Sequence, residues 1–553
     1  MLNLARQTGH SEETVNFMAK VMQKSGVGES SYLSEALLSV PFNVTIEAAR
    51  EESEKAIFGA VDALLAKTKV RSSEIRILIV NCTVFNAIPS LSSVIVNRYR
   101  LREDISSFNL SGMGCSAGLR AIDLAKQLLQ SCHSVFLVDF ACYKPPDSQK
   151  SSRESAVNRA RQHGYSEDIL NFMAKLLQKT GVGDSSYVSE SILSVPPNLT
   201  IEAAREESEK VIFGAMDTLL AKTKVQPSEI NILIVNCTVF NVLPSLSSVI
   251  VNHYRLREDI SSYNLSGMGC SAGLLAIGLA KQLLQVRQDA CALIVSTENT
   301  TSSVYTGVDR SKFLVNCLFR VGGSAVLLSN KSSHRRHSKY QLTHAISTHT
   351  SSSDVSYRCI FREEDSEGNT GITINKDLLV AAILTIEQHL TKLGILILPL
   401  SEKLQFIKNY IIRRLNLAKI KPYIPKFNRC VEHFLPHVGG KPVLDELQKN
   451  LGFRDSDMEP SVMTLHRFGN TSSSSVWYEL AYAEAKRRVR KGDRIWQVAF
   501  GSGFKCSSVI WRALRDVGVD ERNPWMSDID DYPVDFVSTP GSLPYYLEPS
   551  KKE

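Results

Sequence analysis

Residues 264–274 read NLSGMGCSAGL, and residues 274–284, LLAIGLAKQLL, carry apolar side chains at helical spacing. The stretch predicts a glycine-rich turn that places Cys270 just before a helix over Leu274–Leu284. A thiol at the positive end of a helix dipole has a lowered pKa, and its thiolate is a nucleophile. Burial as a small apolar side chain is an equally common fate of a free cysteine, so the spacing alone leaves both interpretations open.

The same motif occurs earlier in the chain, at Cys115, because the chain repeats itself. Residues 5–130 (the first copy) reappear as residues 160–285 (the second copy) without a gap, at a constant offset of 155. Roughly four in five positions are identical, which indicates a tandem duplication whose period is too long for a solenoid. The first copy runs from residue 130 into a strand-like stretch, residues 134–143, and so lacks whatever residues 286–520 supply to the second copy.

Helix and strand signals alternate from the second copy onward, and this alternation predicts an α/β fold with largely parallel sheets. The tail from Asn523 on is expected to be irregular. The predicted helices are Thr200–Leu220, Leu274–Leu284, Asp377–Leu393, Val443–Leu451 and Ser475–Arg490, and the predicted strands are Ile230–Val235, Ala292–Ser296, Ser324–Leu328 and Ile495–Phe500.

Length and composition exclude several classes of protein. The 553 residues are enough for several domains, and 43% apolar and 22% charged residues are close to globular averages, which excludes fibrous and disordered chains. The net charge of +7 is spread along the chain, so no nucleic-acid partner is predicted. The 11 cysteines form no metal-like spacing, which predicts reduced thiols in a cytosol-facing protein.

No membrane crossing is predicted either. The N-terminus has no apolar signal-peptide core, and the longest uninterrupted apolar stretch, residues 393–400, is too short to span a bilayer.

Three later motifs carry groups that suit carbonyl chemistry. In EHFLPHVGG (432–440), Pro436 argues against a helical metal-binding pair of histidines, whereas His437 before Gly-Gly is placed as an acid, base or oxyanion donor. In RFGNTSSSS (467–475), Asn470 is either a helix cap or a donor to a substrate carbonyl. AFGSGFKCSS (499–508) is a strand that ends in a glycine-rich turn. Each motif alone has an ordinary structural interpretation.

Taken together and in this order, GMGCSAG and these three motifs resemble the plant 3-ketoacyl-CoA synthases, the condensing enzymes of very-long-chain fatty acid elongation, over about residues 135–519. The resemblance implies an α/β thiolase-like fold, with two similar βαβ-rich halves layered αβαβα, preceded by an incomplete duplicated half-domain. The expected domains are a partial duplicate (1–130), an N-terminal condensing domain with the nucleophile (134–425), a C-terminal domain with the His and Asn (426–520) and an irregular tail (521–553).

The resemblance also implies the roles of individual residues. Cys270 would accept the acyl group, and His437 and Asn470 would polarise the malonyl thioester and stabilise the enolate left after decarboxylation. Backbone amides of Cys270 and Ser502 would form the oxyanion hole. Supporting roles fall to three recurrent histidines, His349, His433 and His466. No cofactor and no metal are implied.

The implied substrates are a long-chain acyl-CoA and malonyl-CoA. The implied partners are a second identical subunit, in a homodimer, and the elongase reductases and dehydratase, at the cytosolic face of the endoplasmic reticulum membrane. Members of the family carry two transmembrane helices where this chain has the first copy, so anchoring is expected to be lost or peripheral. Cys115 is expected to be silent, because His437 and Asn470 occur once, and the first copy is expected to expose a sheet edge and an apolar face.

Two other functions are compatible with these residues. A type III polyketide synthase uses the same Cys, His and Asn, although the additional segment Lys331–Phe427 favours the elongase interpretation. A non-catalytic duplicate that associates with elongase subunits is the second alternative.

Overall fold

The computed structural model describes residues 2–28, 30–128, 134–414, 423 and 425–534. Contacts divide the chain into two compact units, one of Met1–Arg71 with Glu363–Thr370 and one of Ser72–Arg362 with Gly371–Glu553. The expected domain boundaries at residues 130 and 425 lie at the edge of segments outside the described residues and stay predictions.

The first unit is helical and has little core of its own. It contains α1 (Leu2–Gln7), α2 (Glu12–Ser25), α3 (Glu35–Leu38) and α4 (Ile46–Thr68). The sequences of α2 and α4 recur as α8 (Glu167–Thr180) and α10 (Ile201–Thr223), which bury a full apolar face in the second unit. In the first unit α2 buries only Val15. Nearly the same sequence therefore folds into the same helices but finds no equivalent packing partner.

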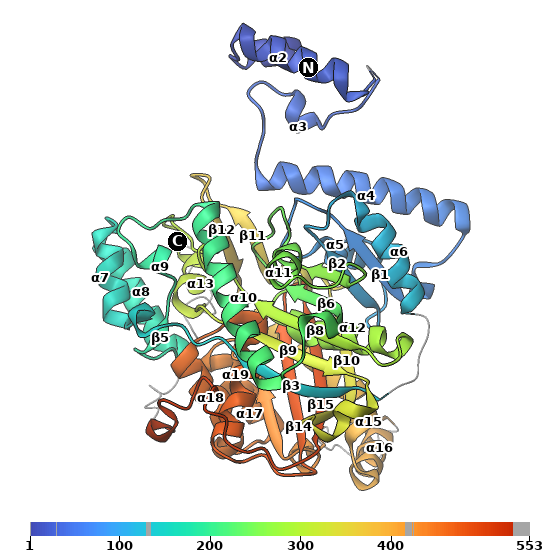
Figure 1. The fold of residues 1–553 in the computed structure, drawn as a ribbon, viewed down its shortest axis with the longest axis vertical. Helices are drawn as coiled ribbons and strands as arrows, with labels where there is room; N and C mark the ends of the chain where they lie inside the picture. The colour runs from blue at the N-terminus through green and yellow to red at the C-terminus, as the bar shows by residue number, and fades with distance from the viewer. Residues whose placement is uncertain (1, 29, 129–133, 415–422, 424, 535–553) are drawn as a thin grey trace. The chain divides into compact units, whose positions relative to one another are not determined.

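One sheet of 11 strands runs through the second unit, in the order β1-β2-β7-β6-β8-β9-β3-β10-β15-β14-β13 (Figure 1). Its strands are β1 (Ile77–Asn81), β2 (Ser106–Leu110), β3 (Phe136–Cys142), β6 (Ile230–Asn236), β7 (Ser261–Leu265), β8 (Cys291–Thr297), β9 (Gly323–Ser329), β10 (Tyr340–His349), β13 (His433–Pro436), β14 (Arg494–Gly501) and β15 (Lys505–Ala513). Two small strand pairs accompany it, β4 (Lys150–Ser151) with β5 (Ser186–Tyr187) and β11 (Ile360–Glu364) with β12 (Thr370–Ile374).

The expectation of a largely parallel sheet is wrong. Strand β6 is parallel to β7 and β8, and β13 is parallel to β14, but β8, β9, β3, β10, β15 and β14 pair antiparallel in succession. Strands β14 and β15 are joined by a turn of only a few residues, which permits an antiparallel pair alone. The α/β class itself is confirmed.

Helices and strands form alternating layers. Helix α12 (Ala272–Val286) contacts β6 and β8 on one side and β10, β14 and β15 on the other. Helix α10 packs outside β3, β8 and β9, and α15 (Leu378–Ile397) packs outside β10 and β15. The expected αβαβα layering is therefore present, with α12 in its centre.

The remaining helices surround this frame. In the second unit they are α5 (Leu91–Tyr99), α6 (Ala117–Gln127), α7 (Arg153–Gln162), α9 (Glu190–Leu193), α11 (Leu246–Tyr254), α13 (Phe313–Leu318), α14 (Asp354–Arg358), α16 (Leu400–Arg414), α17 (Lys441–Leu451), α18 (Asp455–Phe468) and α19 (Ser475–Ala485). Most predicted helices and strands are confirmed within a few residues; the helix expected to run to Arg490 ends at Ala485.

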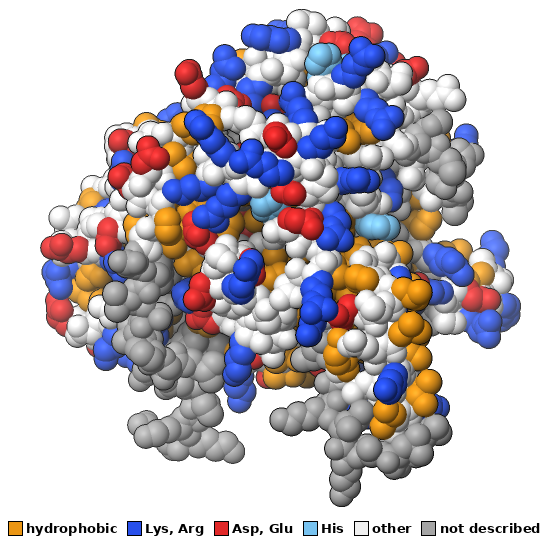
Figure 2. Space-filling view, turned by 90° about the horizontal axis from the view of Figure 1, so that it is seen from below, with side chains coloured by type: hydrophobic (Ala, Val, Ile, Leu, Met, Phe, Trp, Pro, Cys, Tyr) orange, Lys and Arg blue, Asp and Glu red, His pale blue; other side chains and the backbone are white. Residues whose placement is uncertain are grey.

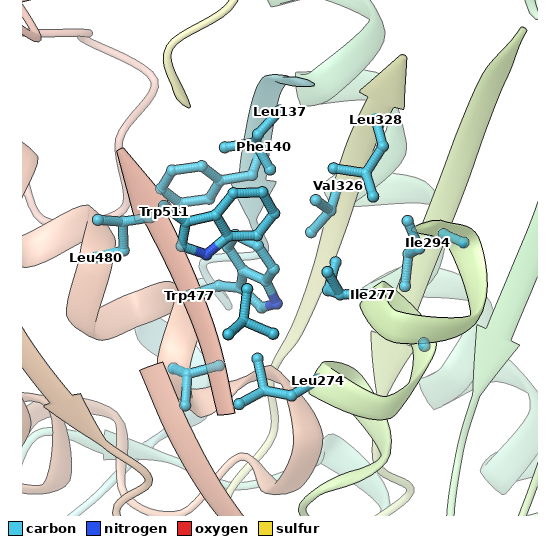
Figure 3. Packing of buried hydrophobic residues seen from close by; sticks show 14 of the residues in the cluster. Leu137, Phe140, Leu274, Ile277, Ile294, Val326, Leu328, Trp477, Leu480 and Trp511 are labelled. Atoms are coloured by element: carbon cyan, nitrogen blue, oxygen red, sulfur yellow. The ribbon is translucent and has the colours of Figure 1, made fainter. Parts of the chain in front are cut away.

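The central core explains why α12 is apolar on several faces. Leu274 and Ile277 of α12 point into the same cluster as Trp477, Leu480 and Trp511 (Figure 3). The Trp511 indole N–H donates to Gln497 Oε1 at 2.8 Å, so the one polar group of this ring is satisfied. The helix that follows Cys270 is thus held from both sides.

Helix α6, the first-copy counterpart of α12, lacks that environment. Leu119 is 75% exposed where Leu274 is 2% exposed, and Ile122 is 70% exposed where Ile277 is fully buried. The expectation that the first copy exposes an apolar face is confirmed at these positions, because the halves of the fold that cover α12 occur only once.

Two features of the second unit bear on the expectations about the tail and about membrane crossing. The tail is irregular, but its described part, to residue 534, is packed, since Trp525 is buried and donates its indole N–H to Tyr478 O at 2.9 Å. Residues 535–553 lie outside the described residues. Helix α15 is longer than the apolar run counted in the sequence. Among the described residues it is the one helix long and apolar enough to cross a membrane, by length and composition alone.

Candidate active site

Cys270 lies in the turn between β7 and α12, two residues before the helix begins at Ala272. The turn passes close to the β14–β15 connection, since a Cβ on Gly269 would lie 2.5 Å from the backbone nitrogen of Ser502. Gly269 also has φ +67°, a conformation that glycine adopts without strain. The glycine at this position therefore allows the backbone at Cys270 and the backbone at Ser502 to approach each other.

The thiol of Cys270 does not have the lowered pKa expected at a helix N-terminus. Burial raises the pKa of the Cys270 thiol to about 12. Hydrogen bonds from Ser472, whose Oγ lies 3.6 Å from the sulfur, and from the side chain of Asn470 oppose this shift only in part. The Cys270 thiol is therefore protonated at neutral pH, and a proton acceptor would be needed to form its thiolate.

His437 follows strand β13 and enters the same space. Its side chain is buried, and neither Nδ1 nor Nε2 has a hydrogen-bond partner among the described residues. Burial lowers the pKa of His437 to about 3, so the imidazole is neutral at physiological pH. A buried imidazole with two free nitrogens can accept one proton and donate another once substrate is bound.

Asn470 connects α18 to the turn before α19. Its Oδ1 accepts a hydrogen bond from the Ser472 backbone N–H at 2.8 Å, and this bond directs the amide NH₂ toward Cys270. Asn470 is also fixed through its backbone, which bridges to Phe319. The Asn470 side-chain oxygen thus caps the turn at Ser472 while its amide NH₂ is left as a donor, so the two interpretations are compatible.

Glu298, just after β8, is a site residue that sequence reasoning missed. Its carboxylate accepts hydrogen bonds from the backbone N–H groups of Thr238 and Val239 at 3.1 and 3.0 Å. Its Oε2 also lies 2.9 Å from Ser472 Oγ, whose single proton is donated either to Glu298 or to Cys270 Sγ. The signal was an acidic residue directly after an apolar strand, in VSTENT, but its partners follow the neighbouring strand β6 and were not identifiable without the fold.

These groups line one cavity, of about 120 Å³. Its polar lining includes Cys270, His437, Asn470, Glu298, Ser472 and Ser502. Thr238, Ser303 and three glycines also line it, and the remaining residues of its wall are apolar: Ile88, Val239, Val315, Leu318, Phe319, Ile360, Ile372, Ile374, Leu378, Leu379, Ala382, Val443, Phe500 and Phe504. The cavity therefore suits a ligand with a carbonyl at one end and a hydrocarbon chain at the other.

The three further histidines lie elsewhere. His349 ends β10 in a separate cavity beside Lys505, and its ring nitrogens are buried without a partner among the described residues. His433 is at the opposite end of β13 from His437 and pairs with Asp493 at 2.9 Å. His466 of α18 packs against the backbone at Gly183. None of the three lines the cavity of Cys270 within the described part of the chain.

The first copy places its cysteine in a different environment. Cys115 is exposed, whereas its counterpart Cys270 is half-buried. No described residue equivalent to His437 or Asn470 faces it, because those motifs occur once.

Comparisons with known proteins identify the class of protein that this fold and site define. The profile of FAE1/type III polyketide synthase-like proteins matches residues 1–134 and again residues 130–415, and that of the 3-oxoacyl-[acyl-carrier-protein] synthase III C-terminal domain matches residues 428–513. Two solved structures share the fold, a mutant of CsyB (TM-score 0.54, 21% identity) and the type III polyketide synthase domain of Steely1 from Dictyostelium (0.53, 15%). Each aligns with 69% of this chain and with 100% and 99% of its own length, respectively. The chain is a thiolase-like condensing enzyme, an acyltransferase.

The particular family follows from closer relatives in Arabidopsis thaliana. 3-Ketoacyl-CoA synthase 11 is 53% identical over 72% of this chain and 79% of its own length, and 3-ketoacyl-CoA synthase 4 is 49% identical over 77% and 83%. The chain belongs to the 3-ketoacyl-CoA synthase family. The doubled match to one profile also confirms the duplication.

Proposed function

We propose that this protein joins a long-chain acyl-CoA to malonyl-CoA and releases a 3-ketoacyl-CoA two carbons longer, together with CoA and CO₂. The observation that carries this proposal is the shared cavity, in which Cys270, His437 and Asn470 meet at the end of an apolar wall. A type III polyketide synthase would need the same three groups, but the 49–53% identical relatives are 3-ketoacyl-CoA synthases.

The reaction begins at the Cys270 thiol. Neutral His437 accepts the thiol proton as sulfur attacks the acyl-CoA carbonyl, and the backbone amides of Cys270 and Ser502 stabilise the oxyanion. The carbon–sulfur bond to CoA breaks, CoA leaves with the proton from His437, and the acyl group remains on Cys270 as a thioester.

Decarboxylation then supplies the carbon nucleophile. His437 and the Asn470 amide donate hydrogen bonds to the malonyl thioester carbonyl, which stabilises the enolate formed as CO₂ departs. The enolate carbon attacks the Cys270 thioester, a carbon–carbon bond forms, the carbon–sulfur bond to Cys270 breaks, and the released thiolate takes a proton from water. Two donors suffice because the electron pair comes from the breaking carbon–carbon bond.

The test is peptide mass spectrometry after incubation with a long-chain acyl-CoA. We expect an acyl adduct on Cys270 that malonyl-CoA discharges to one 3-ketoacyl-CoA. Cys270→Ala removes the adduct, and Cys115→Ala, the matched control in the first copy, leaves the rate within about twofold, a change of less than about 0.5 kcal/mol in the barrier. A folded protein without an adduct supports the non-catalytic alternative, and products extended by several malonyl units support polyketide synthesis.

We also propose peripheral attachment to the cytosolic face of the endoplasmic reticulum membrane, where the elongase reductases and dehydratase would receive the product. Helices α15 and α16 expose a row of apolar side chains, Val380, Ile383, Leu384, Ile395, Leu400, Leu404, Ile407 and Ile411. Lys403, Lys408 and Arg413 lie among those of α16, a combination that favours an anionic lipid surface. Figure 2 shows hydrophobic and basic side chains interspersed on the face that it displays.

Helix α15 also connects this surface to the active site. Leu378, Leu379 and Ala382 in its first turns line the cavity of Cys270. In flotation with vesicles, we expect more bound protein on phosphatidylserine-containing than on pure phosphatidylcholine membranes. Ile407→Glu with Ile411→Glu abolishes this binding, and Val308→Glu, at another exposed apolar position, does not. Equal binding of both variants would contradict the assignment of this surface.

A further inference from the structure

The sheet of the second unit contains one junction at which the two copies of the repeat meet. Strand β2 of the first copy pairs antiparallel with β7 of the second through Leu110 and Leu265. These two leucines are the same position in the two copies. An antiparallel pair of identical segments, opposed at identical positions, is the arrangement that a two-fold axis produces.

The hydrogen bonds around this junction are reciprocal. Ser111 N–H donates to Asn264 O at 3.1 Å, and Ser266 N–H donates to Asn109 O at 3.3 Å. Ser111 corresponds to Ser266 and Asn109 to Asn264, so exchanging the two copies converts each of these hydrogen bonds into the other.

Side chains and glycines repeat the pattern. The Asn86 amide donates to Thr238 O, and the equivalent Asn241 amide donates to Thr83 O. A Cβ on Gly112 would lie 3.1 Å from Ser245 Cβ, and a Cβ on the equivalent Gly267 would lie 3.3 Å from Ser90 Cβ. The interface is therefore isologous, as between two identical subunits, although both sides belong to one chain.

The first copy also completes the active site. Ile88 lines the cavity of Cys270 and is 2% exposed, whereas its counterpart Leu243 is 56% exposed. Ile88 is held there by its carbonyl, which accepts a hydrogen bond from Arg362 N–H at 2.9 Å.

Buried Lys505, which lines the neighbouring cavity of His349, contacts the first copy as well. Its ammonium donates to Ser502 O at 2.7 Å and to Ser93 Oγ of α5 at 2.9 Å. Burial lowers the pKa of Lys505 to about 7, and Ser93 is one of the groups that satisfy it. Ser248, the counterpart of Ser93, is exposed on α11, because the first copy brings no second C-terminal half to cover it.

We propose that residues 72–128 of the first copy occupy, within the same chain, the place of a second subunit, so that the protein is a monomer whose single acyl site is completed by its own Ile88. The junction at β7 is already filled, and a second chain cannot form the same contact. The homodimer expected from the family resemblance is replaced by this internal arrangement. The role of Ile88 in binding the acyl chain rests on the proposed function. The proposed monomeric state of the protein does not.

The decisive experiment uses the full chain without substrate. Glu103 of the first copy lies 4.0 Å from Lys392 of α15, close enough for carbodiimide to join them directly. We mix equal amounts of ¹⁴N- and ¹⁵N-labelled protein, cross-link, and analyse the Glu103–Lys392 peptide pair by mass spectrometry. Only ¹⁴N–¹⁴N and ¹⁵N–¹⁵N pairs are expected, and mixed pairs would overturn the proposal.

Sedimentation should show one species of 61.4 kDa; a dimer at micromolar concentration would also overturn it.

A matched pair of variants tests the contribution of Ile88. Ile88→Phe fills the apolar cavity and should shift the preferred acyl length or reduce acylation of Cys270 by about tenfold. Leu243→Phe, the same change at the exposed counterpart, should leave both unchanged. Equal effects of the two variants would refute completion of the site by the first copy. If the protein forms no acyl adduct at all, the proposed function fails. The isotope and sedimentation results still decide whether the protein is a monomer or a dimer.

Discussion

At the scale of residues, the two groups that we propose to react, the Cys270 thiol and the His437 imidazole, are both neutral at physiological pH. Burial raises the pKa of the Cys270 thiol to about 12 and lowers the pKa of His437 to about 3. In the proposed reaction, proton transfer from Cys270 to His437 would therefore accompany attack on the substrate carbonyl. Without substrate, both groups stay neutral.

Alkylation of the free enzyme tests this state. In a Cys115→Ala background, the rate of Cys270 alkylation by iodoacetamide should rise about tenfold per pH unit from about pH 7 to 10, because the thiolate fraction grows in that proportion below the pKa. The rate is measured by peptide mass spectrometry. A plateau below about pH 9 would show that the thiolate forms at a much lower pKa.

The histidine shifts predict an acid-sensitive fold. The pKa of His437 is lowered, and so is that of His349, which burial and nearby Lys505 keep neutral. The unfolded chain therefore binds these protons first, and stability falls as pH drops below about 6.5, by up to about 1.4 kcal/mol per pH unit for each histidine. Urea unfolding at about pH 7 and pH 5 measures this slope, and His437→Gln should reduce it. An unchanged slope in that variant would place the acid sensitivity at other groups.

At the scale of elements, the turn before α12 is the most demanding piece of backbone. Gly269 has φ +67°, and a Cβ added to it would meet Ser502 N and Gly501 Cα. Its first-copy counterpart Gly114 has φ +64°, but a Cβ added there would have no atom within 4 Å. Both positions favour glycine, but only one is crowded.

Two alanine variants separate these effects. Gly269→Ala should displace Cys270 from the Ser502 backbone amide and reduce the rate of condensation about 100-fold, since misplacement by about 1 Å has that effect. Gly114→Ala has the same backbone strain, about 1–2 kcal/mol, and should leave the rate within about twofold. Loss of activity in both variants would mean that strain, and not the clash with Ser502, is responsible.

Much of this could be predicted from the sequence, and the failures have physical causes. The helix after Cys270 and the strands around it were predictable because apolar periodicity and turn residues act locally. Strand direction was not, because the antiparallel order of β8, β9 and β3 depends on pairing between distant segments. Glu298 was missed because its partners, Thr238 and Val239, follow a neighbouring strand. The thiol pKa of Cys270 was misjudged because burial depends on the C-terminal half of the fold.

At the scale of the whole molecule, equal sequences have unequal environments. Leu274→Ala in α12 should reduce the free energy of unfolding of the second unit by about 2–5 kcal/mol through the cavity it leaves. Leu119→Ala, at the exposed equivalent on α6, should change it by less than about 0.5 kcal/mol. Fluorescence of the buried tryptophans Trp477, Trp496, Trp511 and Trp525 in urea reports on this unit. Similar losses in both variants would show that α6 is covered in solution.

The junction of Leu110 and Leu265 has a genetic consequence. In a dimer of identical chains, one codon specifies this residue in both subunits. A mutation therefore changes the residue that enters the partner's cavity and the same residue in the other subunit together. Here Ile88 and Leu243 are separate codons, and they already differ. Mutation of Ile88 can therefore change the cavity wall without changing the exposed Leu243. In a gene with one copy of this sequence, the two positions could not change separately.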